Sequence, residues 1–184
     1  MTRSNQPTYQ RILFLDRDGV INVDHGYVSK REDFSFLPGI FDLVRAAREQ
    51  AYGVVVVTNQ SGIGRGYYTE DEFWLLTKWM TDQFQARDAQ IDHVFFCPYH
   101  PKAKIEKFRQ VHPWRKPSPG MLLAAKEKFQ PNMAESIFIG DKETDIAAGH
   151  AAGVGTLLLL GTDDKSDPKP TAVIGSLSEA VKWL

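Results

Sequence analysis

Polar side chains that could do chemistry directly follow several short apolar runs of the sequence. The residues concerned are Asp16, Asp18, Thr58 and Asp141. If the apolar runs are parallel strands, the residues that follow them meet at one edge of a sheet, where ligands bind in such folds. Carboxylates gathered at one edge repel one another unless a cation lies between them. The spacing therefore predicts a cation-binding site at the carboxyl ends of the strands.

The residue types favour Mg²⁺ together with a phosphoryl group. Mg²⁺ prefers oxygen ligands and is usually held by one or two carboxylates and a substrate phosphate. The Lys116 ammonium and the Thr58 hydroxyl could then bind the phosphoryl oxygens. The alternative is that Asp and Gly follow strands because they form turns, and for Asp16 and Asp18 alone it explains the pattern equally well. The recurrence of polar groups after several strands favours the site.

The elements that must position these groups alternate between strand and helix patterns. Continuous apolar or β-branched runs predict buried strands at 12–15, 54–57, 94–96, 137–139, 155–160 and 172–174. Helical spacing and capping signals predict helices that begin near Ile40, Thr69, Ser118, Glu143 and Ser176. The segments 97–114 and 161–170 are predicted loops. This alternation predicts an α/β fold with a central parallel sheet and helices on both of its faces.

Composition limits the alternatives. The chain has 184 residues, with 22 Lys+Arg and 23 Asp+Glu, and a formal net charge of −1. These values predict a single domain over 1–184, with a polar tail at 1–10, and argue against a nucleic-acid partner. The chain has one cysteine, its first ten residues are polar, and no apolar run is long enough to span a membrane. We therefore expect a cytoplasmic monomer that does not associate with membranes.

Four motifs resemble those of the haloacid dehalogenase (HAD) superfamily of phosphotransferases. The stretch 14–22 looks like motif I, Thr58 matches motif II, Lys116 matches motif III, and 140–145 matches the acidic motif IV. The chain is most similar to the D-glycero-D-manno-heptose 1,7-bisphosphate 7-phosphatase family, in the stretches 22–27, 57–62, 108–111 and 115–117. This resemblance implies a Rossmann-like HAD core with no separate cap domain.

The same resemblance implies an aspartyl-phosphate mechanism. Asp16 would attack phosphorus, and Asp18 would protonate the departing sugar oxygen and later deprotonate the hydrolytic water. Thr58 and Lys116 would complete the catalytic set by stabilising charge on the phosphoryl group. Mg²⁺ would be held by Asp16, the backbone carbonyl of Asp18, and Asp141.

A further set of residues is implied to contact the substrate. Its members are Asp24, His25, Gly26, Tyr27, Asn59, Gln60, Ser61, Arg115 and Lys142. Arg115 suits the second, non-reacting phosphate because a guanidinium binds phosphate through paired hydrogen bonds. Asp145 lies four residues after Asp141, and we expect it to orient the site rather than to bind the metal.

The loop 97–114 departs from the pattern of the family. Members of the family carry a structural zinc held by Cys-x-His and, later, Cys-x-Cys, whereas the matching positions here are Cys97, Tyr99, His112 and Trp114. Structural zinc nearly always takes four ligands. We therefore expect that the zinc site is lost, with Cys97 and His112 as its remnants, and that Tyr99 and Trp114 pack the loop.

The expected function is Mg²⁺-dependent removal of the 7-phosphate from heptose 1,7-bisphosphate, on the route to nucleotide-activated heptose for surface polysaccharide such as lipopolysaccharide. A small phosphorylated sugar is therefore the expected partner. Two other enzymes remain open, a histidinol-phosphate phosphatase and a polynucleotide 3′-phosphatase. A phospho-accepting receiver-like module is the alternative that is not an enzyme, and Asp18 argues against it because signalling needs no general acid.

Overall fold

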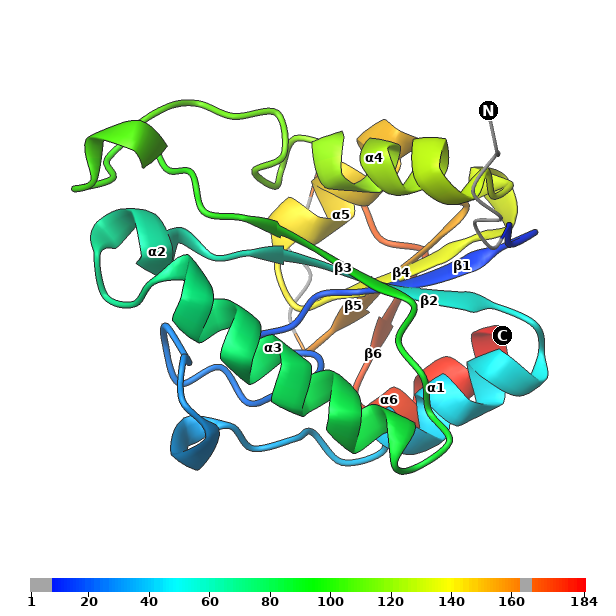
Figure 1. The fold of residues 1–184 in the computed structure, drawn as a ribbon. Helices are drawn as coiled ribbons and strands as arrows, with labels where there is room; N and C mark the ends of the chain where they lie inside the picture. The colour runs from blue at the N-terminus through cyan, green and yellow to red at the C-terminus, as the bar shows by residue number, and fades with distance from the viewer. Residues whose placement is uncertain (1–7, 163–166) are drawn as a thin grey trace, which may run out of the picture.

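The computed structural model describes residues 8–162 and 167–184, and its strands form one parallel sheet (Figure 1). The strand order is β3-β2-β1-β4-β5-β6, and every neighbouring pair is parallel. The strands are β1 (Ile12–Leu15), β2 (Gly53–Asn59), β3 (His93–Cys97), β4 (Ile137–Gly140), β5 (Thr156–Leu160) and β6 (Ala172–Ile174). The predicted α/β class with a parallel sheet is confirmed. Residues 1–7 of the predicted tail and 163–166 of the predicted loop lie outside the described residues.

Helices cover both faces of the sheet, as Figure 1 shows. They are α1 (Ile40–Glu49), α2 (Ser61–Arg65), α3 (Glu70–Gln85), α4 (Gly120–Phe129), α5 (Glu143–Ala152) and α6 (Leu177–Ala180). Short 3-10 helices add η1 (Arg31–Asp33), η2 (Glu106–Phe108), η3 (Met133–Glu135) and η4 (Val181–Trp183). Helices α1, α3 and α6 lie on one face, and α4 and α5 lie on the other. Within the described ranges, no helix combines the length and apolar character needed to cross a membrane.

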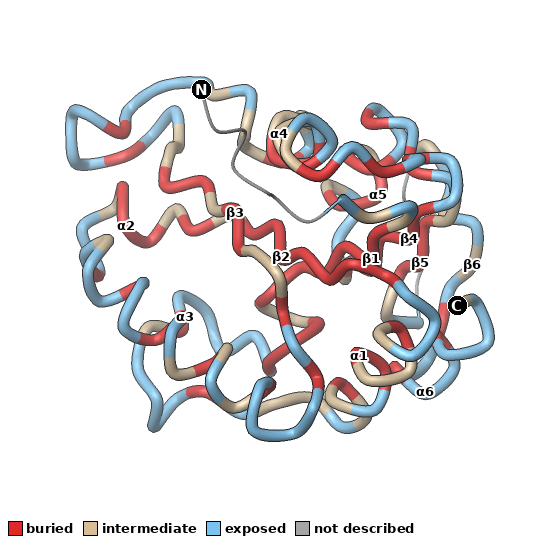
Figure 2. Tube along the Cα trace, turned by 45° about the vertical axis from the view of Figure 1, so that its right-hand side comes forward, coloured by how far each residue is buried: buried red, intermediate tan, exposed pale blue. Residues whose placement is uncertain are grey.

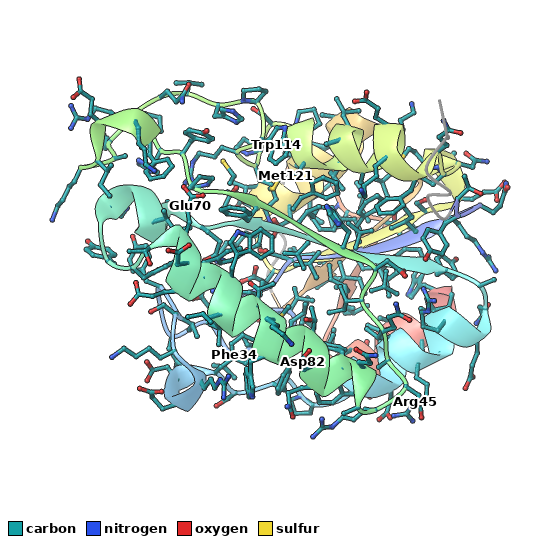
Figure 3. All side chains as sticks on the ribbon, viewed as in Figure 1. Phe34, Arg45, Glu70, Asp82, Trp114 and Met121 are labelled. Atoms are coloured by element: carbon teal, nitrogen blue, oxygen red, sulfur yellow. The ribbon has the colours of Figure 1, made fainter. Side chains whose placement is uncertain are left out.

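The sheet divides the apolar core into two clusters. Successive side chains of a strand point to opposite faces, so Leu13 and Leu15 join the cluster under α1 and α3, whereas Ile12 and Phe14 join the cluster under α4. Met121, at the start of α4, contributes its side chain to this second cluster (Figure 3). The strands are buried throughout their centre, and exposed residues gather on the outer helices and loops (Figure 2). Two covered faces explain why the strands are continuous apolar runs.

Several strands differ from their predicted bounds by one or two residues, so that Cys97 ends β3 and Gly140 ends β4 instead of following them. Differences in β2, α4 and α2 also affect the surroundings of the site. Thr58 and Asn59 do not follow the second strand but end it, because β2 continues its pairing with β3 as far as Asn59 and Cys97. Helix α4 begins one residue later than predicted, with Pro119 rather than Ser118 as its N-cap. The short helix α2 was not predicted, since its five residues include two glycines and carry little helical periodicity.

The order of the strands creates a crevice at the centre of the sheet. From β1 the chain continues to β2 and β3 on one side, and later to β4, β5 and β6 on the other. Ligands of open α/β sheets bind at such a switch point, outside the carboxyl ends of the strands. Asp16 extends from β1 toward β4 and donates its backbone N–H to the carbonyl of Ile139, at 3.1 Å. This topology brings the residues after β1, β2 and β4 to one place.

Candidate active site

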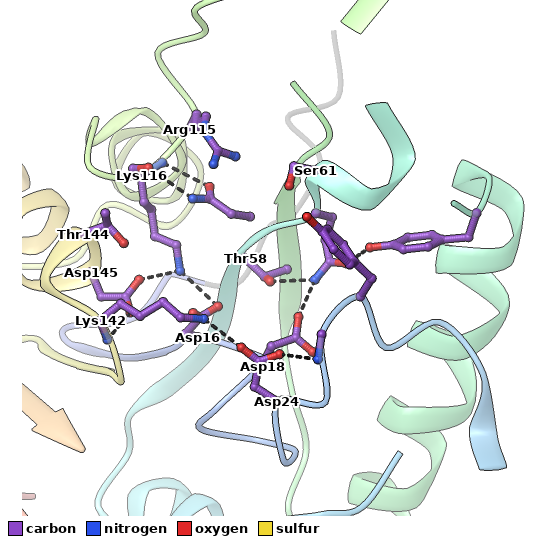
Figure 4. A pocket seen from close by; sticks show the side chains of 15 residues that line it. Asp16, Asp18, Asp24, Thr58, Ser61, Arg115, Lys116, Lys142, Thr144 and Asp145 are labelled. Atoms are coloured by element: carbon purple, nitrogen blue, oxygen red, sulfur yellow. Dashed lines mark hydrogen bonds and ion pairs between the residues drawn. The ribbon is translucent and has the colours of Figure 1, made fainter. Parts of the chain in front are cut away.

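A cavity of about 460 Å³ lies at the carboxyl ends of β1, β2 and β4 (Figure 4). Most of the residues predicted to act on or bind a substrate line it, and these are Asp16, Asp18, Asp24, Gly26, Tyr27, Thr58, Asn59, Gln60, Ser61, Arg115, Lys116 and Lys142. His25 is exposed and is not among the lining residues. Asp141 is not in the lining either, but its carboxylate lies beside that of Asp16.

Lys116 is the centre of the site. Its side chain is 3% exposed, and its Nζ lies 3.0 Å from Asp16 Oδ1 and 2.6 Å from Asp145 Oδ1. The same Nζ donates to the backbone carbonyl of Val57, 2.9 Å away. Burial alone would lower the pKa of Lys116, but the carboxylates of Asp145 and Asp16 outweigh it and raise the pKa. The lysine is therefore a fixed cation beside Asp16 (Figure 4).

The carboxylates at this edge form a cation-binding group. One oxygen from each of Asp16, Asp141 and Asp145 lies within 4.8 Å of the others. Burial raises the pKa of Asp16 to about 7 and that of Asp141 to about 6, and repulsion from Asp145 adds to both shifts. Asp141 Oδ1 is buried and has no hydrogen-bond partner. Oxygen ligands and an unpaired buried acceptor fit a hard cation such as Mg²⁺.

Asp145 differs from the other two carboxylates because its partners are within the protein. It pairs with Lys116, and its Oδ2 accepts a hydrogen bond from the backbone N–H of Lys142 at 3.1 Å. Gly140 leaves room for it, since a Cβ on Gly140 would lie 2.2 Å from the Asp145 Cβ. These contacts agree with the expectation that Asp145 orients the site.

Asp18 is held by donors on both of its carboxylate oxygens. The guanidinium of Arg17 donates to Oδ1 from Nε at 3.2 Å and to both oxygens from Nη2 at 2.9 Å. Asn22 donates to Oδ1 at 3.0 Å, and Gln60 Nε2 donates to Oδ2 at 2.9 Å. Arg17 is itself 1% exposed and donates to the carbonyl of Val28. The carboxylate of Asp18 therefore has a defined orientation at the wall of the cavity.

Asn59 joins the end of β2 to the loop that carries Lys116. Its Nδ2 donates to the Lys116 carbonyl, and its Oδ1 accepts from the Lys116 N–H, both at 3.1 Å. The peptide bond between Lys116 and Pro117 is cis. The side chain of Asn59, predicted to bind substrate, thus also fixes the backbone at Lys116.

The loop after β1 reaches across the cavity and contacts the loop after β4. Asp24 Oδ2 lies 2.9 Å from Lys142 Nζ, although the two residues are 118 positions apart. This contact and the backbone N–H of Gly26 lower the pKa of Asp24 against the opposing effect of burial. Tyr27 is 46% exposed and packs edge-on against Tyr67, with ring centres 4.7 Å apart. Asp24 and Tyr27 therefore line the mouth of the cavity.

The loop 97–114 is packed by aromatic rings. The His112 ring stacks on Tyr99 with centroids 4.1 Å apart, and Trp114 packs edge-on against Phe95. His112 Nδ1 accepts a hydrogen bond from the backbone N–H of Trp114 at 3.1 Å. Cys97 is buried, with its Sγ 4.0 Å from the carbonyl of Tyr99. The predicted packing roles of Tyr99 and Trp114 are confirmed.

This aromatic packing leads directly into Arg115. The backbone N–H of Arg115 donates to the carbonyl of His112 at 3.0 Å, and Nη1 donates to the carbonyl of Tyr99 at 3.4 Å. The guanidinium of Arg115 also forms part of the cavity wall (Figure 4). Arg115 thus stands across the cavity from Asp18 and Asp24.

Tyr68 and Thr144 line the cavity but were not predicted as site residues. Thr144 lies within the acidic motif 140–145, so that motif could have identified it. Tyr68 precedes the capping box of α3 by one residue, and its ring reaches the cavity beside Gly62 of α2, a contact that no local pattern indicates.

Comparisons with known proteins identify relatives of this chain. The sequence profile of the HAD-hydrolase-like family matches residues 113–180. The chain is 53% identical over 156 residues to the D-glycero-alpha-D-manno-heptose-1,7-bisphosphate 7-phosphatase of Burkholderia mallei, an alignment that covers 85% of this chain and 82% of that protein. It is 47% identical over 157 residues to the D-glycero-beta-D-manno-heptose-1,7-bisphosphate 7-phosphatase of Escherichia coli K12, with the same two coverages of 85% and 82%.

A solved structure shows the same fold over the whole chain. The crystal structure of a putative HAD-like phosphatase from Mesorhizobium loti superposes with a TM-score of 0.87 at 30% sequence identity, covering 100% of this chain and 90% of that one.

Proposed function

Because the chain belongs to the D-glycero-D-manno-heptose-1,7-bisphosphate 7-phosphatase family, we propose that it hydrolyses the 7-phosphate of heptose 1,7-bisphosphate. Membership makes the chain a phosphoric monoester hydrolase of the HAD type. The sugar and the position of the ester are the proposed part. On this proposal the product is a heptose 1-phosphate, which feeds the synthesis of nucleotide-activated heptose.

One observation carries the proposal. The buried Lys116 ammonium lies 3.0 Å from the Asp16 carboxylate, in a cavity that Asp18 and Thr58 also line. A nucleophilic carboxylate beside a fixed cation suits attack on a phosphoryl group, since the cation neutralises charge on the transferring oxygens. Asp18 adds the proton donor that turnover requires.

The proposed reaction proceeds in two steps. A carboxylate oxygen of Asp16 forms a bond to phosphorus as the bond from phosphorus to the sugar oxygen breaks, and Asp18 gives its proton to that oxygen. A water molecule then attacks phosphorus while Asp18 takes a proton from it, the bond between phosphorus and the Asp16 oxygen breaks, and inorganic phosphate leaves with the Asp16 carboxylate restored. Thr58 and Lys116 hold the phosphoryl oxygens in both steps.

Mg²⁺ is the metal that the residues fit. The carboxylates of Asp16 and Asp141 and the backbone carbonyl of Asp18 would hold it, and the unpaired Oδ1 of Asp141 supports this assignment. When bound, the ion supplies positive charge against the phosphoryl oxygens. Asp145 remains paired with Lys116 and keeps both groups in position.

The cationic side of the cavity suits the second phosphate of a bisphosphate. Arg115 and Lys142 line the cavity on either side of the buried Lys116. We assign Arg115 to the non-reacting phosphate because its guanidinium can form paired hydrogen bonds. The loop residues Asp24 and Tyr27, and Ser61 at the start of α2, are assigned to the sugar.

The proposal also covers the ligand, the cellular compartment and the oligomeric state. A cavity of about 460 Å³ is suited to a small phosphorylated sugar. The net charge of −1 gives no basis for binding nucleic acid. With its single cysteine, the chain fits a reducing compartment, and we propose that it acts in the cytoplasm as a monomer.

Phosphate release from a substrate panel tests the proposal. The panel comprises the α and β anomers of heptose 1,7-bisphosphate, histidinol phosphate and a 3′-phosphorylated oligonucleotide, each assayed with Mg²⁺. We expect the highest kcat/KM for one heptose bisphosphate anomer and loss of phosphate release in Asp16→Asn with the fold intact. Faster turnover of histidinol phosphate or of the oligonucleotide would replace the heptose assignment, and turnover by Asp16→Asn would remove Asp16 as the nucleophile.

A further inference from the structure

The side chain of Gln60 is committed entirely within the protein. It is 1% exposed, and its Nε2 donates to Asp18 Oδ2 and to Thr58 Oγ1, both at 2.9 Å. Its Oε1 accepts a hydrogen bond from the hydroxyl of Tyr68 at 2.5 Å. An amide has two N–H donors and one carbonyl acceptor, so each group of this amide already has a partner.

The orientation of the Gln60 amide follows from these partners. Both Asp18 oxygens accept hydrogen bonds from Arg17, which can only donate, and the NH₂ end of the amide faces the same Oδ2 as a further donor. The carbonyl end then faces Tyr68, which donates its O–H. Burial raises the pKa of Tyr68, and the hydroxyl therefore keeps the proton that it donates.

The ring of Tyr68 is fixed in turn. It is 6% exposed, and a Cβ on Gly62 would lie 2.3 Å from its Cε1, so the ring fits closely against a glycine of α2. A continuous set of contacts thus leads from α2 through Tyr68 and Gln60 to Asp18.

We propose that Tyr68 and Gln60 are positioning residues that hold the Asp18 carboxylate in place for proton transfer, through the hydrogen bonds from the Tyr68 hydroxyl to Gln60 and from Gln60 to Asp18. This inference rests on the proposed function, because it assigns Asp18 the proton transfer. It gives Gln60 a positioning role besides the substrate contact that the sequence predicts.

Removal of the Tyr68 hydroxyl breaks this set of contacts at one point. In Tyr68→Phe the Gln60 carbonyl becomes a buried acceptor without a partner, which is costly enough to turn the amide. Arg17 would still donate to both Asp18 oxygens and Asn22 to Oδ1, but Oδ2 would lose the second donor that Gln60 provides. The carboxylate then loses the donor that approaches it from the end of β2, and its alignment with the leaving oxygen becomes less exact.

The leaving group reveals whether proton transfer is affected. A sugar alkoxide is a poor leaving group and needs the proton from Asp18, whereas the nitrophenolate of p-nitrophenyl phosphate leaves without one. The kcat/KM value reports the steps up to phosphoryl transfer to Asp16, where this proton is used. Misplacing Asp18 should therefore lower kcat/KM for the sugar phosphate much more than for the aryl phosphate.

The experiment compares both substrates in Tyr68→Phe, Gln60→Ala and the double variant, with Mg²⁺ present and with rates normalised to folded protein. General acid–base catalysis contributes about 10²–10⁴-fold, and a misaligned acid keeps part of it. We expect Tyr68→Phe to lose about tenfold on the sugar phosphate and less than about threefold on the aryl phosphate. Gln60→Ala should show the same selectivity, and adding Tyr68→Phe to it should cause no further loss.

Tyr52→Phe is the matched control. Tyr52 is also buried, and its hydroxyl accepts a hydrogen bond from Arg11, at the opposite end of β2 from the site. This variant should not alter the ratio of the two kcat/KM values. Equal losses on both substrates in Tyr68→Phe, or independent losses in the double variant, would overturn the inference.

Failure of the proposed function would look different. If the wild-type chain hydrolyses another alkyl phosphate better than heptose bisphosphate, the heptose assignment fails. The comparison of that alkyl ester with the aryl phosphate still tests Tyr68 and Gln60.

Discussion

Lys116→Met replaces the buried ammonium with an apolar side chain of similar length. The substitution removes a positive charge that lies 3.0 Å from Asp16 Oδ1 and 2.6 Å from Asp145 Oδ1. At an effective dielectric constant of about 20, two unit charges 3 Å apart interact by about 5 kcal/mol. Much of this attraction offsets the cost of burying the charges, and breaking a buried pair costs about 3–5 kcal/mol in measured cases. We expect a loss of that size in the free energy of unfolding of the metal-free protein at pH 8.

The loss should depend on pH in a defined direction. Burial already raises the pKa of Asp16 to about 7 in the wild type, where the Lys116 ammonium opposes the rise, so the pKa of Asp16 lies still further above its unfolded value in the variant. A group with a raised pKa in the folded state binds more protons there. The stability of the variant therefore falls as pH rises from the unfolded pKa to the folded pKa of that group. The difference from wild type should therefore shrink when the pH is lowered from 8 to 5.5.

Urea unfolding followed by tryptophan fluorescence measures both effects, since the chain has 4 tryptophans. Lys78→Met is the control, because Lys78 pairs with Asp82 at 2.7 Å but is 73% exposed, where solvent screens the pair. With Mg²⁺ present, Lys116→Met should also lower kcat/KM by about 10²–10³-fold, the usual effect of removing one group that stabilises transition-state charge. The reasoning is refuted if Lys116→Met is as stable as Lys78→Met at pH 8, or if its deficit is the same at pH 5.5.

Four further predictions concern the metal, the second phosphate and the loop. Gly19→Ala should weaken Mg²⁺ binding measured by calorimetry, because the added Cβ would lie 2.2 Å from Asp141 Oδ2. Gly153→Ala is the control: Gly153 also has a positive φ, but no atom of the described residues lies within 4 Å of its Cβ position, so this variant should bind Mg²⁺ with unchanged affinity. Burial raises the pKa of Asp141 to about 6 in the metal-free protein, so protons compete with Mg²⁺ for this carboxylate at low pH. The Mg²⁺ affinity should therefore increase as pH rises from about 5 to 7, and a constant affinity would contradict this. Arg115→Ala should raise KM for a bisphosphate more than for a monophosphate in steady-state assays, and equal effects would exclude it from second-phosphate recognition. Metal analysis should find no stoichiometric zinc in the purified protein, because the His112 ring stacks on Tyr99 and its Nδ1 accepts from a backbone N–H; one zinc per chain would refute this.

The sequence predicted most strands and long helices because their signals are local. Continuous β-branched residues mark β2, and the capping box of Thr69 and Glu72 that was predicted for α3 is present, with Thr69 Oγ1 accepting from the Glu72 N–H at 3.1 Å. Helix α5 ends before Gly153, as predicted, because a left-handed residue there favours glycine. Each of these signals lies within a few residues of the element that it specifies.

The sequence failed where pairing between segments decides the structure. Thr58 and Asn59 belong to β2 because β3 provides partners for them, which no residue near Thr58 indicates. Helix α2 has weak local propensity, and its buried residues pack against the rest of the protein. The contact of Tyr68 with Gln60 has no local signal either, since its importance depends on where Asp18 lies.

The sequence by itself determined which side chains are available for chemistry and which strands precede them. A DxD motif after an apolar run, and a second acidic motif after another, sufficed to predict a cation and a phosphoryl group at one edge of a sheet. Only the tertiary structure decided how these groups are paired. Lys116 lies between Asp16 and Asp145, Asn59 ties the Lys116 backbone to β2, and the Gln60 amide donates to Asp18. The physical reason is that a buried charge or amide is stable only with partners in the right geometry, and those partners come from distant parts of the chain that only the fold brings together.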